Sequence, residues 1–157
     1  KLFFNKKNIY FITLVILIFI SDRLTKFEII NNFSDNIYYI SDFVNFNLIW
    51  NTGIGFGLFS SNSPLIYNLI TTLIGFVILV LFYIAIFLDN LNKIIYSIII
   101  GGALGNFYDR LLYKAVPDFI DLHYDSIHWF TFNLADIFIT LGIIIFIMKD
   151  FFLNKSK

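Results

Sequence analysis

Two aspartates near the carboxyl end of the chain are the residues best suited to chemistry. Asp136 stands at the head of an apolar run, 137–148, and Asp118 lies a short distance upstream. Insertion scales put the cost of a carboxylate near mid-bilayer at roughly 2.5 to 3.5 kcal/mol, so an ionisable residue at membrane depth indicates a functional site. Two such carboxylates suggest acid/base catalysis. Taken separately, each also fits an ordinary role, as a solvated loop acid or as a helix-start acid that complements the dipole.

The composition is that of an integral membrane protein. Of the 157 residues, 59% are hydrophobic and only 14% are charged, and the mean hydropathy is +0.81, far from a soluble domain. The absence of cysteine excludes disulfides, thiolate metal sites and a cysteine nucleophile. His123 and His128 have no further ligands at a metal-binding spacing, so we interpret them as ordinary loop or interface histidines. We therefore expect no metal, no other cofactor and no nucleic-acid partner.

Four apolar stretches predict four membrane-spanning helices in one domain, 1–157. They cover approximately 8–26, 65–88, 94–110 and 133–150. Only the second is long and free of charge; the others reach the roughly 20 residues needed to cross a bilayer only by including polar residues. No small-x-small cleavage site follows the first stretch, so we expect it to be retained. The predicted fold is an all-α four-helix transmembrane bundle.

Two outer segments, 27–64 and 111–132, join these spans. Residues 31–50 alternate loosely between apolar and polar types, which fits a short strand or hairpin, or an element lying on the headgroups. Segment 111–132 contains Pro117, both histidines and several acids. We predict that it is a loop contributing to the site.

The distribution of basic residues predicts that both termini are cytoplasmic. Lysine and arginine concentrate in short cytoplasmic loops, and in a four-span model most of the lysines share one side: Lys1, Lys6, Lys7, Lys93, Lys149, Lys155 and Lys157. A rise of 1.5 Å per residue puts Asp22 about 22 Å, Arg110 about 25 Å and Asp136 about 20 Å from the inner lysines. Three helices should thus bring charge to one level, inside the outer leaflet.

Two glycine-containing segments accompany these charges. The small residues of 101–105 permit close approach of another helix, the more common use of such residues in membranes, or of a substrate, and Asn106 adds an amide. The glycines of 51–60 invite close approach by an extended peptide. No phosphate-binding loop is present there, because the segment lacks a Gly-Lys-Ser/Thr ending.

Charged residues near the predicted span ends are expected to form specific pairs. Asp22 and Lys26 are four apart, hence on one helix face, and can form an ion pair that serves either the span end or the site. Asp109 and Arg110 are adjacent and should have separate partners. Asn133 precedes Asp136 by one helical turn.

In their order along the chain, these segments resemble the lipoprotein signal peptidases (signal peptidase II) of bacteria. The matching blocks are Asp22-Arg23-Leu24-Thr25-Lys26, Asn51-Thr52-Gly53, the run from Gly101 to Arg110, Val116-Pro117-Asp118-Phe119 and Phe132-Asn133-Leu134-Ala135-Asp136. The resemblance implies a four-span aspartic peptidase of the bacterial cytoplasmic membrane. It also implies cytoplasmic termini, an active site at the outer leaflet and a small extracytoplasmic β-containing platform.

The resemblance implies roles for particular residues. Asp118 and Asp136 fall on the catalytic aspartates, and eight residues fall on motif positions around the site: Asp22, Lys26, Asn51, Gly53, Asn106, Arg110, Asn133 and Ala135. Among these, Arg110 and Asn106 are our candidates for holding the substrate backbone or stabilising developing charge. Pro117 and Gly55 depart from the residues common in the family, but neither change removes a functional side chain.

The implied partners are a diacylglyceryl-modified prolipoprotein, cleaved before its lipidated cysteine, and membrane lipid, with the enzyme acting as a monomer. Other classes fit less well. A small transporter or channel subunit would repeat motifs between halves or place charges near mid-plane. A scaffold protein would leave the paired aspartates unexplained, and the Gly-x-Gly-Asp motif of another class of intramembrane protease does not occur.

Overall fold

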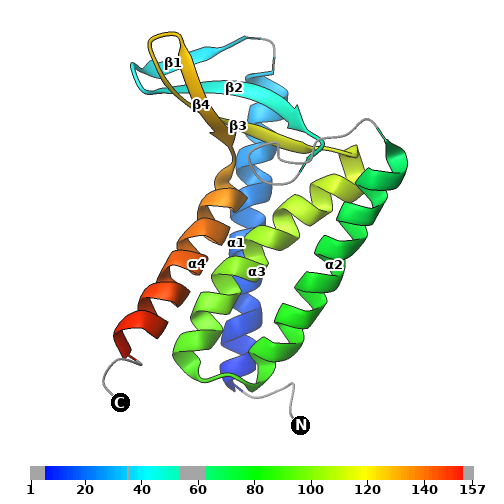
Figure 1. Ribbon diagram of the computed structural model, residues 1–157, viewed down its shortest axis with the longest axis vertical. Coiled ribbons are helices and arrows are strands. Elements are labelled where there is room, and N and C mark those ends of the chain that lie inside the picture. Colours follow the sequence, from blue (N-terminus) through cyan, green and yellow to red (C-terminus); the bar gives the residue numbers. More distant parts are fainter. Residues whose placement is uncertain (1–5, 35, 54–62, 154–157) are drawn as a thin grey trace.

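In the part of the chain that the structure describes, four helices run between the two ends of the molecule and a sheet covers one end (Figure 1). The computed structural model describes residues 6–34, 36–53 and 63–153. Its helices are α1 (Lys6–Asn32), α2 (Pro64–Phe87), α3 (Asn90–Tyr113) and α4 (Leu134–Leu153). Helices α1 and α2 are long and apolar enough to cross a membrane. The arrangement of four spans stays a prediction.

The strands form one antiparallel sheet in the order β1-β2-β3-β4. They are β1 (Tyr38–Ser41), β2 (Val44–Asn51), β3 (Val116–Tyr124) and β4 (Ile127–Phe132). The strand or hairpin expected within 31–50 is confirmed. The loop predicted for 111–132 is wrong: α3 continues to Tyr113, and β3 and β4 follow. Pairing between β2 and β3 places Ile49 opposite Asp118.

Local signals mark where the helices begin and end. Pro64 starts α2, where its missing N–H is not needed. The Asp89 carboxylate caps α3 by accepting a hydrogen bond of 3.0 Å from the backbone N–H of Asn92. Lys114 ends α3 in the left-handed conformation, with φ of 59°.

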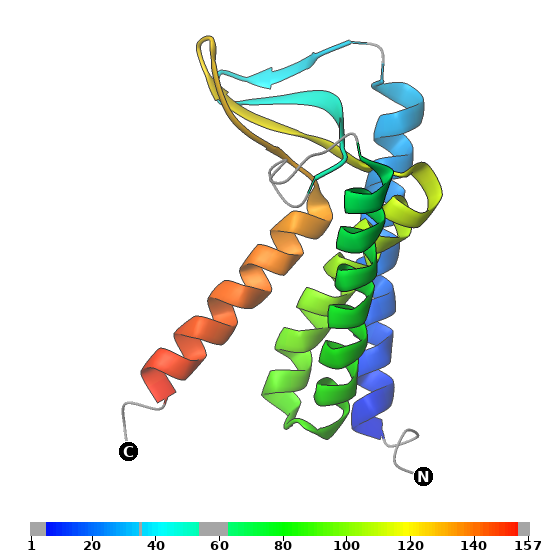
Figure 2. The same ribbon diagram turned by 45° about the vertical axis from the view of Figure 1, so that its right-hand side comes forward.

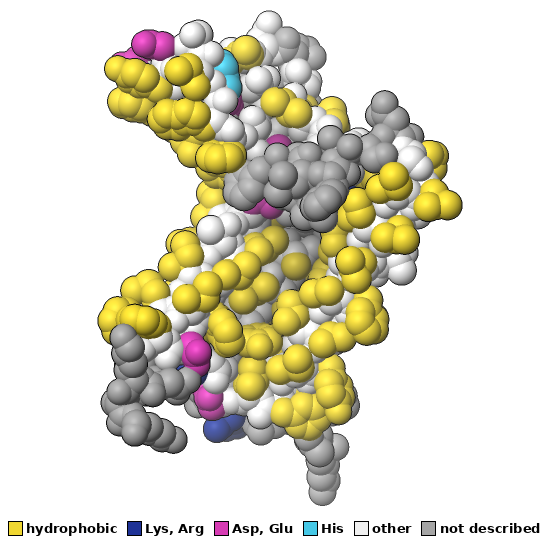
Figure 3. Space-filling view, in the orientation of Figure 1, with side chains coloured by type: hydrophobic (Ala, Val, Ile, Leu, Met, Phe, Trp, Pro, Cys, Tyr) yellow, Lys and Arg dark blue, Asp and Glu magenta, His cyan; other side chains and the backbone are white. Residues whose placement is uncertain are grey.

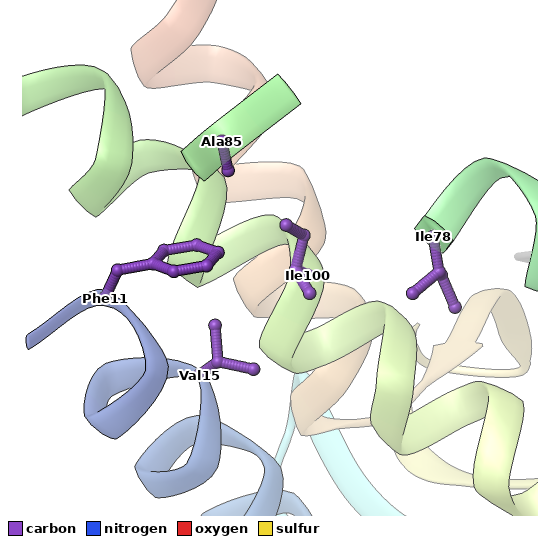
Figure 4. Close-up of a cluster of buried hydrophobic side chains, with 5 residues drawn as sticks. All are labelled: Phe11, Val15, Ile78, Ala85 and Ile100. Atoms are coloured by element: carbon purple, nitrogen blue, oxygen red, sulfur yellow. The ribbon is translucent and has the colours of Figure 1, made fainter. Parts of the chain in front are cut away.

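A small apolar core joins the first three helices. Phe11, Val15, Ile78, Ala85 and Ile100 form its buried cluster (Figure 4). Outside this core the helices expose large apolar side chains, such as Leu65 and Leu79 of α2 (Figure 3). Such a large apolar surface is expected of a protein that lies in lipid.

Adjacent glycines of α3 hold it close to α1 on one side and to α4 on the other, although α4 is inclined to the other three helices (Figure 2). A Cβ atom on Gly101 would lie 2.7 Å from Cβ of Ile18, and one on Gly102 would lie 2.6 Å from the carbonyl oxygen of Ala135. These two glycines therefore serve helix contacts, one of the two uses that the sequence left open.

We predict that Gly102→Ala destabilises the protein by about 1–3 kcal/mol through overpacking, because the new methyl group meets the backbone of α4. Thermal unfolding of the purified protein in detergent, followed by tryptophan fluorescence, measures the change. Gly75→Ala is the matched control: it makes the same change in a helix, but its methyl group meets the far end of the Phe107 side chain, which can shift more readily than backbone. Equal stability of the two variants would contradict the close contact.

Candidate active site

One asparagine binds both of the aspartates singled out by the sequence. Asp118 is buried on β3, and Asp136 lies in the first turn of α4. The Nδ2 of Asn133 donates a hydrogen bond of 2.6 Å to Oδ1 of Asp118. Its backbone N–H donates one of 3.2 Å to Oδ2 of Asp136. Asn133 lies between β4 and α4, so the end of the sheet and the start of the helix bring the two carboxyl groups to one place.

The spacing of Asn133 and Asp136 has a local cause. Asn133 Oδ1 accepts a hydrogen bond of 3.1 Å from the backbone N–H of Asp136, while the Asp136 carboxylate accepts the N–H of Asn133. This reciprocal arrangement is a capping box, which satisfies two N–H groups that a helix start leaves without partners. The positive end of the helix dipole also favours a carboxylate there.

A second amide binds each carboxyl group from another direction. Asn51 Nδ2 donates to Oδ2 of Asp118 at 2.9 Å, and Asn106 Nδ2 donates to Oδ1 of Asp136 at 2.8 Å. Burial raises the pKa of Asp118 to about 7, with a further contribution from the charge of Asp136 and opposition from the Asn51 and Asn133 hydrogen bonds. Burial therefore favours the protonated form of Asp118.

Behind these amides lies a buried cluster of two acids and two bases. The predicted ion pair between Asp22 and Lys26 is confirmed, with a distance of 3.0 Å. Lys26 Nζ also lies 2.7 Å from Oδ2 of Asp109 and donates to Oδ1 of Asn106 at 2.8 Å. Arg23 binds Asp22 at 2.8 Å and Asp109 at 2.5 Å. Asp22, one of the charges expected at a common level, is thus joined to α3 through Asp109, whereas Arg110, the charge expected there on α3, is not part of this cluster.

Arg23 and Asp109 were not among the predicted site residues, although the sequence contained a signal for each. Arg23 is part of the first matching block, and Asp109 lies almost one turn beyond Asn106 on the same helix. Their distinct roles depend on contact between α1 and α3, which spacing within either helix does not reveal.

The cluster also fixes the start of α4. Asp22 Oδ1 accepts a hydrogen bond of 3.1 Å from the backbone N–H of Ala135, whose side chain is fully buried. A Cβ atom on Gly105 would lie 2.3 Å from Oδ2 of Asp22. The absence of a side chain at Gly105 therefore lets the carboxylate approach α3.

Arg110 binds the chain that follows β2. Its guanidinium donates to the carbonyl oxygen of Gly53 and lies over the Tyr67 ring, 5.6 Å from the centroid. Gly53 N–H in turn donates to Oδ1 of Asn51 at 2.8 Å. The prediction that Asp109 and Arg110 have separate partners is confirmed. The glycines at 55 and 57 lie outside the described residues.

The two predicted substrate-holding residues differ in what they can still bind. Both polar atoms of the Asn106 amide are used, by Lys26 and by Asp136, so Asn106 positions a carboxylate. Arg110 retains one buried guanidinium nitrogen, Nη1, without a hydrogen-bond partner among the described residues. Arg110 can therefore bind a further carbonyl oxygen, and the Asn106 amide nitrogen carries a second N–H besides the one that it donates to Asp136.

An apolar pocket adjoins the aspartates. It has a volume of about 310 Å³ and is formed by α4 and the sheet. Asp136 is the acidic residue in its lining, which otherwise comprises Leu122, Phe130, Phe132, Ile137, Thr140 and Leu141. A peptide or lipid segment held there would therefore lie next to a carboxyl group.

The two histidines lie on the sheet but make none of the contacts described for Asp118 and Asp136. His123 and His128 stack with ring centroids 5.4 Å apart, and Nδ1 of His128 lies 2.7 Å from Asp121. They are opposite each other on β3 and β4, in paired strands and not in a loop.

The chain is similar to known proteins in both sequence and fold. A family model described as signal peptidase (SPase) II matches residues 14–152. A lipoprotein signal peptidase of Pelagibacter ubique (strain HTCC1062) is 48% identical, over 98% of this chain and 95% of the relative. A lipoprotein signal peptidase of Thermodesulfovibrio yellowstonii is 41% identical, over 87% of this chain and 90% of the relative. A solved structure described as a bacterial membrane enzyme has a TM-score of 0.75 and 29% identity, covering 94% of this chain and 93% of the other.

The contacts of Asp118 predict how its titration responds to substitution. Asn51→Leu removes a hydrogen bond that favours the carboxylate, so the pKa of Asp118 should rise above about 7. Asp136→Asn removes a negative charge nearby, so the same pKa should fall. Infrared pH titration of the carboxyl band, identified by its loss in Asp118→Asn, measures both shifts. A midpoint that moves in the same direction in the two variants would contradict this arrangement.

Proposed function

The chain belongs to the signal peptidase II family, and we propose that it cleaves diacylglyceryl-modified prolipoproteins before the lipidated cysteine, with Asp118 and Asp136 as the catalytic pair. It is an aspartic peptidase that removes signal peptides from prolipoproteins. The main support for assigning Asp118 and Asp136 as the catalytic pair is Asn133, which donates one hydrogen bond to each of their carboxyl groups.

In the proposed mechanism the two carboxyl groups share one proton, because two close carboxylates resist ionising together. The ionised group accepts a proton from water, whose oxygen attacks the scissile carbonyl carbon. The protonated group donates its proton to the carbonyl oxygen. Collapse of the tetrahedral intermediate breaks the C–N bond: one carboxyl group gives its proton to the leaving nitrogen, and the other carboxylate accepts the proton of an intermediate hydroxyl as the C=O bond reforms. The pair then holds one proton again, and its apparent pKa values belong to both groups.

The surrounding residues suit this chemistry because they bind the pair without neutralising it. Asn51, Asn106 and Asn133 are amides, so they orient the carboxyl oxygens but add no net charge. Lys26 acts on Asp136 through Asn106. We assign to Arg110 the binding of a substrate carbonyl or of charge that develops on it, using Nη1, which has no hydrogen-bond partner within the described part of the chain.

We further propose that all four helices cross the membrane, with both termini cytoplasmic and the active site at the outer leaflet. Helices α1 and α2 have the length and composition for this, and α1 begins and α4 ends at the end opposite to the sheet (Figure 1). The described inner lysines are Lys6, Lys7, Lys93 and Lys149; Lys1, Lys155 and Lys157 lie outside the described residues. One chain supplies all the proposed site residues, so the enzyme can act as a monomer.

Asp118→Asn and Asp136→Asn should each reduce cleavage of a lipidated precursor by at least about 1,000-fold, because the pair can no longer both accept and donate the proton. Gel analysis of cleavage by purified protein in detergent measures the loss, with protein abundance checked in membranes. The matched control is Asp125→Asn, in an exposed turn with φ of 50°, which asparagine also tolerates. Full activity in either pair variant would refute the assignment.

The lipid on the substrate should contribute to recognition. We expect a precursor whose cysteine is replaced by serine, and which therefore lacks diacylglycerol, to be cleaved with at least about tenfold lower kcat/KM, because it loses the acyl chains that hold the cleavage site in the leaflet. The comparison uses wild-type enzyme and the two precursors at equal concentration. Equal kcat/KM values would show that the enzyme selects the peptide alone.

A further inference from the structure

A groove runs between α1 and α3 at the end of the bundle opposite to the sheet. It has a volume of about 540 Å³ and takes no part in the site described above. Its walls are largely apolar, with Phe11, Leu14, Leu17 and Ile94 among them. At about 1.5 Å per residue, the part of α1 from Lys6 to Leu17 is about 16 Å long. The groove therefore has room for a substantial part of an acyl chain.

Three lysines line the end of this groove nearest the helix starts. Lys6 and Lys7 are exposed on α1, and Lys93 comes from the first turn of α3. All three belong to the end of the groove where the two helices begin, whereas Leu17 lies three turns further along α1. The groove thus carries positive charge at one end and hydrocarbon at the other.

Lys93 is the unusual member of this group, because it is buried, with 6% of its surface exposed. Its Nζ donates to Asn8 Oδ1 at 2.5 Å and to the carbonyl oxygen of Ile86 at 2.9 Å. Both acceptors are neutral, and no carboxylate of the described residues forms a salt bridge with it. A buried positive charge is usually paired with a negative one. Among the described residues no carboxylate pairs with Lys93, so an anionic ligand would supply the missing partner.

The acid nearest in sequence does not supply that anion. Asp89 caps α3 and binds both the backbone and the side chain of Asn92. The charge of Lys149 also contributes to lowering the pKa of Asp89. Asp89 is therefore engaged with Asn92 and Lys149.

We propose that this groove binds one anionic phospholipid, with its phosphate at Lys6, Lys7 and Lys93 and an acyl chain along Leu14 and Leu17. The charge of the three lysines selects the headgroup, and the apolar walls hold the chain. The site is independent of the catalytic pair. The proposed topology enters only in naming the leaflet, which would be the cytoplasmic one, where anionic lipids attract basic segments.

Native mass spectrometry of the full chain in detergent tests the proposal with phosphatidylglycerol and phosphatidylcholine of identical acyl chains. Phosphatidylglycerol should bind at least about fivefold more tightly. Lys93→Gln, which keeps a donor for Asn8 but removes the charge, should weaken its binding about fivefold, the usual effect of one basic residue near anionic lipid. Lys149→Gln is the matched control, since Lys149 lies at the same end, binds Asn92 and does not line the groove.

A second pair of variants tests the acyl part and does not depend on the folding of Lys93→Gln. Leu14→Trp places a bulky ring in the groove and should weaken phosphatidylglycerol binding at least about threefold. Leu79→Trp, at an exposed position of α2, should leave it unchanged. Equal affinity for the two lipids would overturn the proposal, as would equal losses in a variant and its control. Cleavage activity is not the readout, so failure here leaves the catalytic assignment unaffected.

Discussion

The buried ammonium group of Lys26 is the constraint on which the arrangement of the helices depends. Only 1% of its surface is exposed, and removing a charge from water costs several kcal/mol unless partners compensate. Asp22 and Asp109 supply two negative charges and Arg23 a second positive one, so the cluster is neutral. Lys26 and Arg23 come from α1 and Asp109 from α3. These two helices must therefore meet in one register for the charges to be satisfied.

Because this cluster is neutral, it adds no net charge to the electrostatic environment of the adjacent carboxyl groups of Asp118 and Asp136. Asn106 separates Lys26 from Asp136 by accepting a hydrogen bond from one and donating to the other. A direct ion pair would favour the ionised carboxylate and lower its pKa. With an amide in between, the carboxyl group is oriented but keeps its ability to take up a proton. Asp118 likewise receives amide hydrogen bonds; burial and the charge of Asp136 raise its pKa to about 7, against the lowering by these hydrogen bonds and by the charge of Lys26.

What the sequence could predict was limited to relations within one helix and to depth along it. The Asp22 and Lys26 pair and the one-turn spacing of Asn133 and Asp136 both follow from helical geometry. The common depth of the charges on different helices stays a prediction. The hairpin of β3 and β4 was missed because its acids, histidines and Pro117 masked the strand pattern. Strand pairing is non-local, so no spacing indicated that Asn51 would bind Asp118 across β2 and β3.

The two carboxyl groups come from different parts of the fold, and this explains why Asn133 is needed between them. Asp118 belongs to the sheet and Asp136 to a helix of the bundle, so any movement of one part against the other would separate the pair. Asn133 follows β4 and caps α4, and its hydrogen bonds reach both groups. Ala135 N–H ties the same turn to Asp22. The ion cluster thus fixes the start of α4, and Asn133 transfers that position to the carboxyl group on the sheet.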